Sequence, residues 1–152
     1  MLKNIVSPTT GTDHMNLIRL LGIEAYTESD TEEYMNSNQI NHFKELLIAW
    51  KTHLLQSAGQ TATYLQNDDN QHPDITDSAT QVEEHDNRIR FSERERKLTN
   101  RIDSTVHSIE DGQYGFCESC GAEIGVKRLE ARPVANLCID CKTLAEEAEQ
   151  VY

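Results

Sequence analysis

Residues 36–54 read NSNQINHFKELLIAWKTHL and predict the beginning of a long amphipathic helix. Apolar side chains recur at alternating spacings of three and four residues, which is the pattern of a helix that buries one face against another helix. Asn36 and Gln39 have the spacing of a capping box, so the helix is expected to begin there. Gly59 is a weak point within it. The repeating apolar positions are Ile40, Phe43, Leu47, Trp50 and Leu54.

A polar segment and a second predicted helix follow. Residues 67–76 read NDDNQHPDIT, a composition typical of a turn. The second helix is expected from about Asp77 to Glu110, and Gly112 suits its C-terminal cap. Its predicted apolar face consists of Val82, His85 and Ile89 in the first half, and of Leu98, Ile102, Val106 and Ile109 in the second. The faces of both helices become polar toward the turn, so we expect a firm base and an exposed tip.

The two helices predict a hairpin. Each has roughly 32 residues and would be about 48 Å long at 1.5 Å per residue. Because a single turn joins them, they should pack as an antiparallel coiled coil. An ordinary helical bundle is the alternative, but the sequence shows no third long helix to complete one. We therefore expect a mainly α protein in which residues 36–111 form the coiled-coil hairpin, with its tip near residues 67–79.

The chemistry of the chain is concentrated in its four cysteines. They form two pairs, Cys117-x-x-Cys120 and Cys138-x-x-Cys141, separated by 17 residues. This spacing is typical of a four-cysteine zinc site, and four thiolates leave no open position for catalysis, so the ion should be structural. Two redox-active motifs are the alternative, but no βαβ pattern surrounds them. Gly121 suits the left-handed backbone of a metal-binding turn.

The remaining parts of the chain are expected to complete a small globular unit. Residues 112–152 would form the zinc finger and a C-terminal helix over Lys142–Glu149. Residues 1–35 would form an N-terminal segment that packs with this globular part, with one or two helical turns in Met15–Gly22.

Charge argues against nucleic acid as the direct partner. The formal net charge is −12, and the one basic stretch, Arg88 to Arg101, is interleaved with acidic residues. A DNA-binding protein needs a dense cationic face to displace counterions, so a protein partner is favoured. The sequence has no long apolar run for a membrane span and no convincing secretory signal, so we expect a cytoplasmic protein.

Several segments resemble the DksA family of bacterial transcription factors. These are GFCESCGAEIG at 115–125, RLEARP at 128–133 and LCIDCKTLAE at 137–146, together with GIEAY, EYMN and RERKL, which begin at residues 22, 33 and 94. The resemblance covers roughly residues 15–150. It implies a monomeric, non-enzymatic protein that holds one zinc ion. The tip of its hairpin would enter the secondary channel of RNA polymerase. There it would modulate initiation at ribosomal RNA promoters, in the stringent response, together with ppGpp and without binding DNA.

The resemblance also assigns roles to individual residues. The family's tip signature Asp-x-x-Asp-x-Ala corresponds to Asp74, Asp77 and Ala79, although Asp77 could simply cap the second helix. Arg94 corresponds to a position associated with polymerase contact, and an ion pair with nearby Glu residues of the same helix is the alternative. The positions matching the family's ppGpp site are Leu98, Arg101, Arg132 and Lys142, of which three are cations suited to pyrophosphate groups.

Two residues of the predicted hairpin depart from the family's pattern. His85 replaces a common apolar residue, and Phe91 stands where relatives usually have a polar one. Three other functions stay open at the level of sequence: a Gre-like factor that stimulates transcript cleavage, a zinc-finger DNA-binding protein, and a structural or redox-sensing zinc protein. A Gre-type factor also uses acidic tip residues but has a different globular domain.

Overall fold

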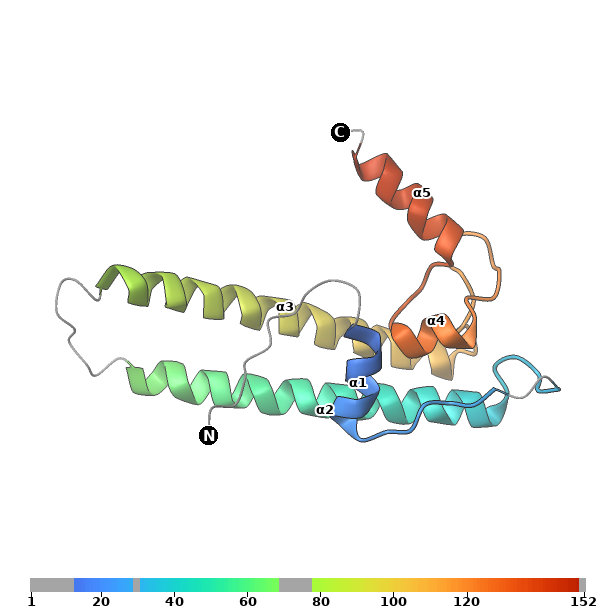
Figure 1. Ribbon diagram of the computed structural model, residues 1–152, viewed down its shortest axis with the longest axis horizontal. Helices are drawn as coiled ribbons and strands as arrows, with labels where there is room; N and C mark the ends of the chain where they lie inside the picture. The colour runs from blue at the N-terminus through green and yellow to red at the C-terminus, as the bar shows by residue number, and fades with distance from the viewer. Residues whose placement is uncertain (1–12, 29–30, 69–77, 151–152) are drawn as a thin grey trace.

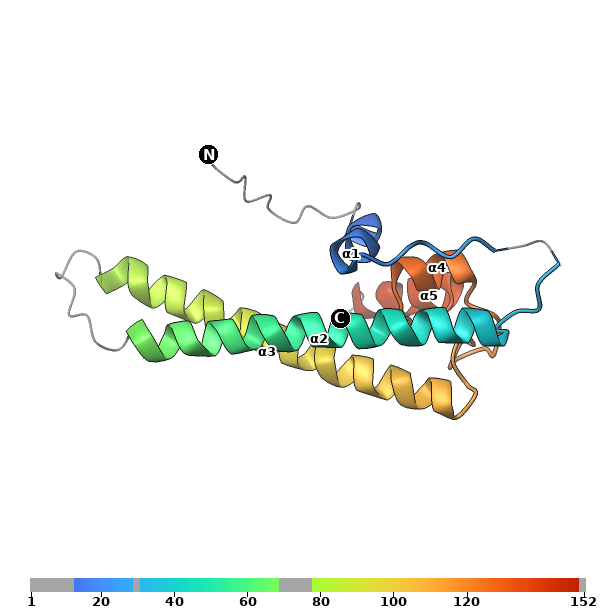
Figure 2. The same cartoon turned by 90° about the horizontal axis from the view of Figure 1, so that it is seen from below.

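The computed structural model describes residues 13–28, 31–68 and 78–150, and its described part is mainly helical, as predicted (Figure 1). Two long helices, α2 and α3, lie side by side; α1 lies beside the middle of α2, α4 lies nearer the base of the pair, and α5 projects away from it (Figures 1 and 2). None of the described helices is long and apolar enough to cross a lipid bilayer. The helices are α1 (Asp13–Leu21), α2 (Ser37–Asp68), α3 (Ser78–Glu110), α4 (Val126–Ala131) and α5 (Ile139–Gln150).

The hairpin is held most firmly at its base, where the chain enters α2 and leaves α3. Its core there consists of fully buried apolar side chains, including Phe43, Leu47 and Ile102. Ion pairs join the two helices along one flank, from Lys51 to Asp103 and from Lys44 to Glu110. The predicted apolar positions in the first helix and in the second half of the second helix are therefore confirmed as buried or partly buried.

Local hydrogen bonds determine where α2 begins and where α3 ends. The Asn36 side chain accepts hydrogen bonds from the backbone N–H groups of Asn38 and Gln39, at 2.9 and 3.0 Å. The reciprocal bond of this cap goes one residue further back than a standard capping box, because Gln39 Oε1 accepts from the N–H of Met35 at 2.8 Å. Helix α3 ends in a Schellman motif in which Gly112 has φ +71°.

The predicted buried face in the first half of α3 is wrong. Val82 is 60% exposed, Ile89 is 41% exposed, and His85 is exposed as well. Phe91, 53% exposed, also lies on the outside of the hairpin.

The register of α3 explains this difference. Ile109 and Ile102 are buried at the base, and further steps of seven residues along the helix lead to Glu95 and Arg88. Glu95 is only 8% exposed and Arg88 is partly buried. The seam is therefore apolar at the base and polar toward the tip, because the base fixes which side of α3 faces α2.

The segment between α1 and α2 ties the globular part to the hairpin. The Tyr34 hydroxyl donates to the carbonyl of Gly115 at 2.7 Å and accepts from the N–H of Gly125 at 3.1 Å. Earlier in this segment, the Tyr26 backbone N–H donates to Glu130 on α4, whose carboxylate also lies 3.4 Å from the imidazole of His42 on α2. These contacts join the segment, α2 and α4 into one packed unit.

A close approach in this unit requires glycine. Gly115 has φ +92°, and a Cβ atom there would stand 2.8 Å from the Cγ of Met35. Met35 itself has a positive φ of 53°, which bends the chain into the beginning of α2. Any other residue at position 115 would be strained at this φ, and the Met35 side chain would have to move to make room for its Cβ.

Candidate metal centre and cationic pocket

The four cysteines meet at one point, as the sequence predicted. Their sulfur atoms all lie within 4.8 Å of one another, and Cys120 Sγ is 3.7 Å from Cys138 Sγ. A tetrahedral zinc ion with Zn–S bonds of about 2.3 Å would separate its sulfur ligands by about 3.8 Å. The arrangement therefore fits one structural Zn²⁺ held by Cys117, Cys120, Cys138 and Cys141.

Each cysteine pair is shaped by its own local fold. The first pair lies in a tight turn in which the Gly121 N–H donates to the Cys117 carbonyl and the Cys117 N–H donates to the Ala122 carbonyl, both at 2.8 Å. Gly121 has φ +73°, which confirms the predicted left-handed conformation. The second pair lies at the beginning of α5, where the Cys141 N–H points at Cys138 Sγ at 3.5 Å.

The crowding of the sulfur atoms shifts their protonation. Backbone N–H groups, that of Cys138 foremost, lower the pKa of the Cys117 thiol to about 6. The hydrogen bond with the Cys138 thiol raises the pKa of Cys141 to about 12. Four thiolates at this distance repel one another, so full deprotonation needs a bound cation, and Zn²⁺ supplies one.

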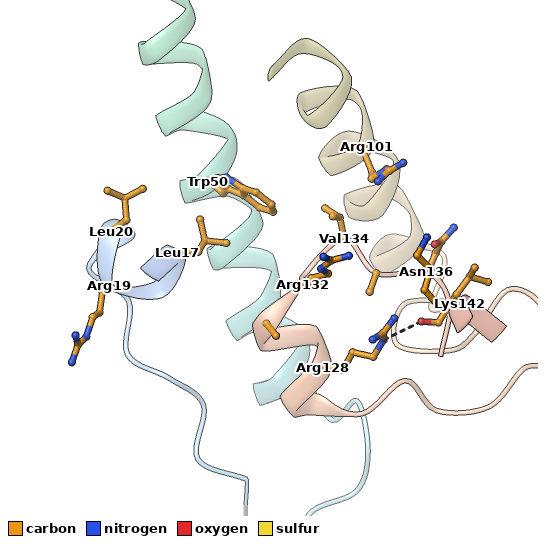
Figure 3. A pocket seen from close by; sticks show the side chains of 13 residues that line it. Leu17, Arg19, Leu20, Trp50, Arg101, Arg128, Arg132, Val134, Asn136 and Lys142 are labelled. Carbon is orange, nitrogen blue, oxygen red and sulfur yellow. Dashed lines mark hydrogen bonds between the residues drawn. The ribbon is translucent and has the colours of Figure 1, made fainter. Parts of the chain in front are cut away.

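A cavity of about 880 Å³ lies beside the hairpin base, and its lining includes Leu137 and Lys142, the residues directly before and after the second cysteine pair. Its walls come from five helices and from the segment between α4 and α5 (Figure 3). Leu17 and Leu20 of α1 and Trp50 of α2 form an apolar side. The cationic residues in its lining are Arg19, Arg101, Arg128, Arg132 and Lys142.

Three of the four residues predicted for a ppGpp site line this cavity. They are Arg101 of α3, Arg132 at the C-terminal end of α4 and Lys142 of α5. The fourth, Leu98, is partly buried and packs against the hydrophobic core. Lys142 also pairs with Glu146 on the same helix at 3.2 Å. Residues far apart in the sequence thus converge on one cationic pocket, while their ligand stays a prediction.

Only two of the four residues predicted to contact polymerase lie in the described part of the chain. Asp74 and Asp77 lie outside the described residues, and Ala79 belongs to the first turn of α3. Arg94 is exposed on α3.

Comparison with known proteins agrees with this architecture. A family model for the N-terminal domain of DnaK suppressor protein DksA matches residues 39–109, and one for the prokaryotic dksA/traR C4-type zinc finger matches residues 112–147. The chain belongs to the DksA family. The two DksA models correspond to the two parts described above, the helical hairpin and the four-cysteine unit with α4 and most of α5.

Individual DksA proteins resemble the chain over nearly its whole length. The RNA polymerase-binding transcription factor DksA of Salmonella typhimurium is 47% identical over 139 residues, which cover 91% of this chain and 92% of the relative. The protein of the same name from Escherichia coli strain K12 is 46% identical over the same shares. The structure of transcription factor DksA2 from Pseudomonas aeruginosa superposes with a TM-score of 0.72 at 29% identity, covering 87% and 97% of the two chains.

Trp50 and Arg128 are among the pocket residues that the sequence pattern did not predict. Trp50 was predicted only as a seam residue, yet it also lines the cavity. The RLEARP segment gives Arg128 no role of its own, yet its Nε–H donates to the carbonyl of Leu137 at 3.2 Å (Figure 3). No spacing rule marks either residue as part of a pocket, because the cavity is assembled from elements distant in the chain.

Proposed function

We propose that this protein binds bacterial RNA polymerase directly and modulates transcription initiation by placing the tip of its hairpin in the secondary channel. The observation that carries the proposal is the near full-length similarity to RNA polymerase-binding transcription factors, which spans both hairpin and zinc finger. A rod of about 48 Å, the length of α2 at 1.5 Å per residue, suits entry into a narrow channel. The protein acts through contacts and catalyses no reaction itself.

The effector of the proposed function is ppGpp, held at the interface with polymerase. Arg101, Arg132 and Lys142 line one cavity and carry the positive charge that two pyrophosphate groups require. Ribosomal RNA promoters are the proposed targets, and the effect would be deepened by ppGpp during the stringent response. The protein would work as a cytoplasmic monomer without binding DNA, which agrees with its formal net charge of −12.

In vitro transcription from a ribosomal RNA promoter tests the role of the tip. The unmodified protein should inhibit, whereas the Asp74→Asn/Asp77→Asn variant should bind polymerase and fail to inhibit. An Asp68→Asn/Asp69→Asn variant removes the same charge beside the signature and should inhibit normally. Equal inhibition by all three proteins would contradict a working role for the signature, and no inhibition by the unmodified protein would contradict the proposed function.

Titration of ppGpp in the same assay tests the cationic pocket. Arg101→Ala should raise the ppGpp concentration needed for half-maximal inhibition about tenfold, the effect of losing a hydrogen bond to a charged group. Arg96→Ala removes an exposed cation of the same helix that does not line the cavity, and should leave the titration unchanged. Equal shifts for both variants would show that general charge, and not the pocket, determines the response.

A further inference from the structure

The segment 132–138 connects α4 to the second cysteine pair and forms part of the cavity wall. It is held from three sides by hydrogen bonds to its carbonyl groups. The carbonyl of Pro133 accepts from the buried Tyr114 hydroxyl at 2.9 Å, and that of Asn136 accepts from the N–H of Glu118 at 3.0 Å. The third bond, from Arg128 to the Leu137 carbonyl, comes from the side of the cavity.

Arg128 is bonded to both ends of this segment. Its backbone carbonyl accepts from the N–H of Arg132 at 2.8 Å, which closes the last turn of α4. Its side-chain Nε–H holds Leu137, the residue directly before Cys138. The Cys138 carbonyl in turn accepts from the N–H of Lys142 at 3.0 Å. A short series of hydrogen bonds therefore links one pocket cation, Arg132, through Arg128 to a zinc ligand and to a second pocket cation, Lys142.

We propose that Arg128 is a positioning residue that couples the zinc-binding turn of Cys138 to the cationic pocket. By fixing the Leu137 carbonyl, its Nε–H keeps Cys138 in place for the metal and sets Lys142 opposite Arg132. The pocket half of this proposal rests on the proposed function, in which the cations bind ppGpp. Arg128 need not touch that ligand, because its effect is transmitted through the segment it holds.

Two substitutions separate the hydrogen bond from the charge. In Arg128→Gln, the amide Nε2 stands the same number of bonds from Cα as the arginine Nε, so a donor toward Leu137 is kept while the charge is lost. In Arg128→Lys, the charge is kept, but a carbon atom stands at that position. Lys127→Gln is the matched control, because Lys127 is an exposed cation on the same helix.

Zinc release from the full-length, zinc-loaded proteins is the first measurement, followed with a chromogenic chelator. The Arg128→Lys variant should release zinc about fivefold faster than the unmodified protein, the effect of one lost hydrogen bond. The Arg128→Gln variant and the control should match the unmodified protein. The second measurement, the ppGpp concentration for half-maximal inhibition with polymerase, should show the same order of variants.

The opposite order, with Arg128→Gln impaired and Arg128→Lys normal, would overturn the proposal, because Arg128 would then act as a direct charge. Equal behaviour of the two variants, whether both normal or both impaired, would overturn it too. If ppGpp has no effect even with the unmodified protein, the proposed effector role is wrong. The zinc-release comparison still decides in that case whether the Arg128 hydrogen bond keeps Cys138 in place for the metal, because it requires neither polymerase nor ppGpp.

Discussion

Glu95 offers a direct test of how the hairpin is held together toward its tip. Its side chain is buried between α2 and α3, and its Oε1 accepts a hydrogen bond from the Ser57 hydroxyl at 3.0 Å. Its Oε2 has no hydrogen-bond partner among the described residues. A buried polar atom without a partner costs about 1–3 kcal/mol. We therefore predict that Glu95→Leu stabilises the hairpin by about 2 kcal/mol, since it removes this atom and adds apolar contact.

Hydrogen exchange measures the effect where it arises. A gain of about 2 kcal/mol should slow exchange of the α3 amides near residue 95 by about 30-fold, because each 1.4 kcal/mol is a factor of ten. Ser57→Ala should have the opposite effect, since it takes the hydrogen bond from a carboxylate that stays buried. In the double variant, Ser57→Ala should cost much less than it does alone, because the partner that needs the hydroxyl is gone.

The result that refutes this reasoning is a loss of protection in Glu95→Leu. It would mean that the interactions of the Glu95 carboxylate stabilise the hairpin by more than the burial of this carboxylate destabilises it. Additive effects of the two substitutions would also contradict it, because they would show that Ser57 and Glu95 do not act as a pair.

Three further predictions concern the base and the zinc-binding unit. Ile102→Ala should lower the free energy of unfolding by about 2–5 kcal/mol in chemical denaturation, because Ile102 is completely buried between the long helices. Tyr34→Phe should cost about 1–3 kcal/mol in the same measurement, since it leaves the Gly115 carbonyl and the Gly125 N–H without their shared hydroxyl. Removal of zinc with a chelator should broaden the NMR signals of residues 114–142 while circular dichroism retains most of its helical signal, because α2 and α3 pack on each other without the metal.

The parts that the sequence predicted well are those encoded in local spacing. The zinc site follows from two cysteine pairs, and each pair is brought together by a turn of a few residues. The base of the hairpin follows from large apolar residues such as Phe43 and Ile102, whose side chains are stable only when they are buried in the core. Such signals need no knowledge of how distant segments are arranged.

The tip half of the hairpin shows where local spacing fails. Val82 and Ile89 are separated by seven residues and fit a helical stripe, but the same is true of Glu95 and Arg88. Only the packing of Ile102 and Ile109 at the base decides which of the two stripes faces α2. The spacing rule predicts that the apolar stripe is buried. Because the helix is stiff, the side of α3 that packs against α2 at the base also faces α2 toward the tip.

The cationic pocket depends even more than the hairpin on how distant segments of the chain are arranged. Arg101 belongs to the hairpin, whereas Arg132 and Lys142 flank the second cysteine pair from either side in the chain. Their separation is therefore set by how segment 132–138 folds onto the hairpin base, and that fold is anchored at Cys138. A structural zinc ion placed there does more than stabilise a small unit that lacks a large core. If the pocket binds ppGpp as proposed, the ion also holds cations from two parts of the chain toward one ligand, and we predict that loss of the metal weakens the ppGpp response before it disrupts the hairpin.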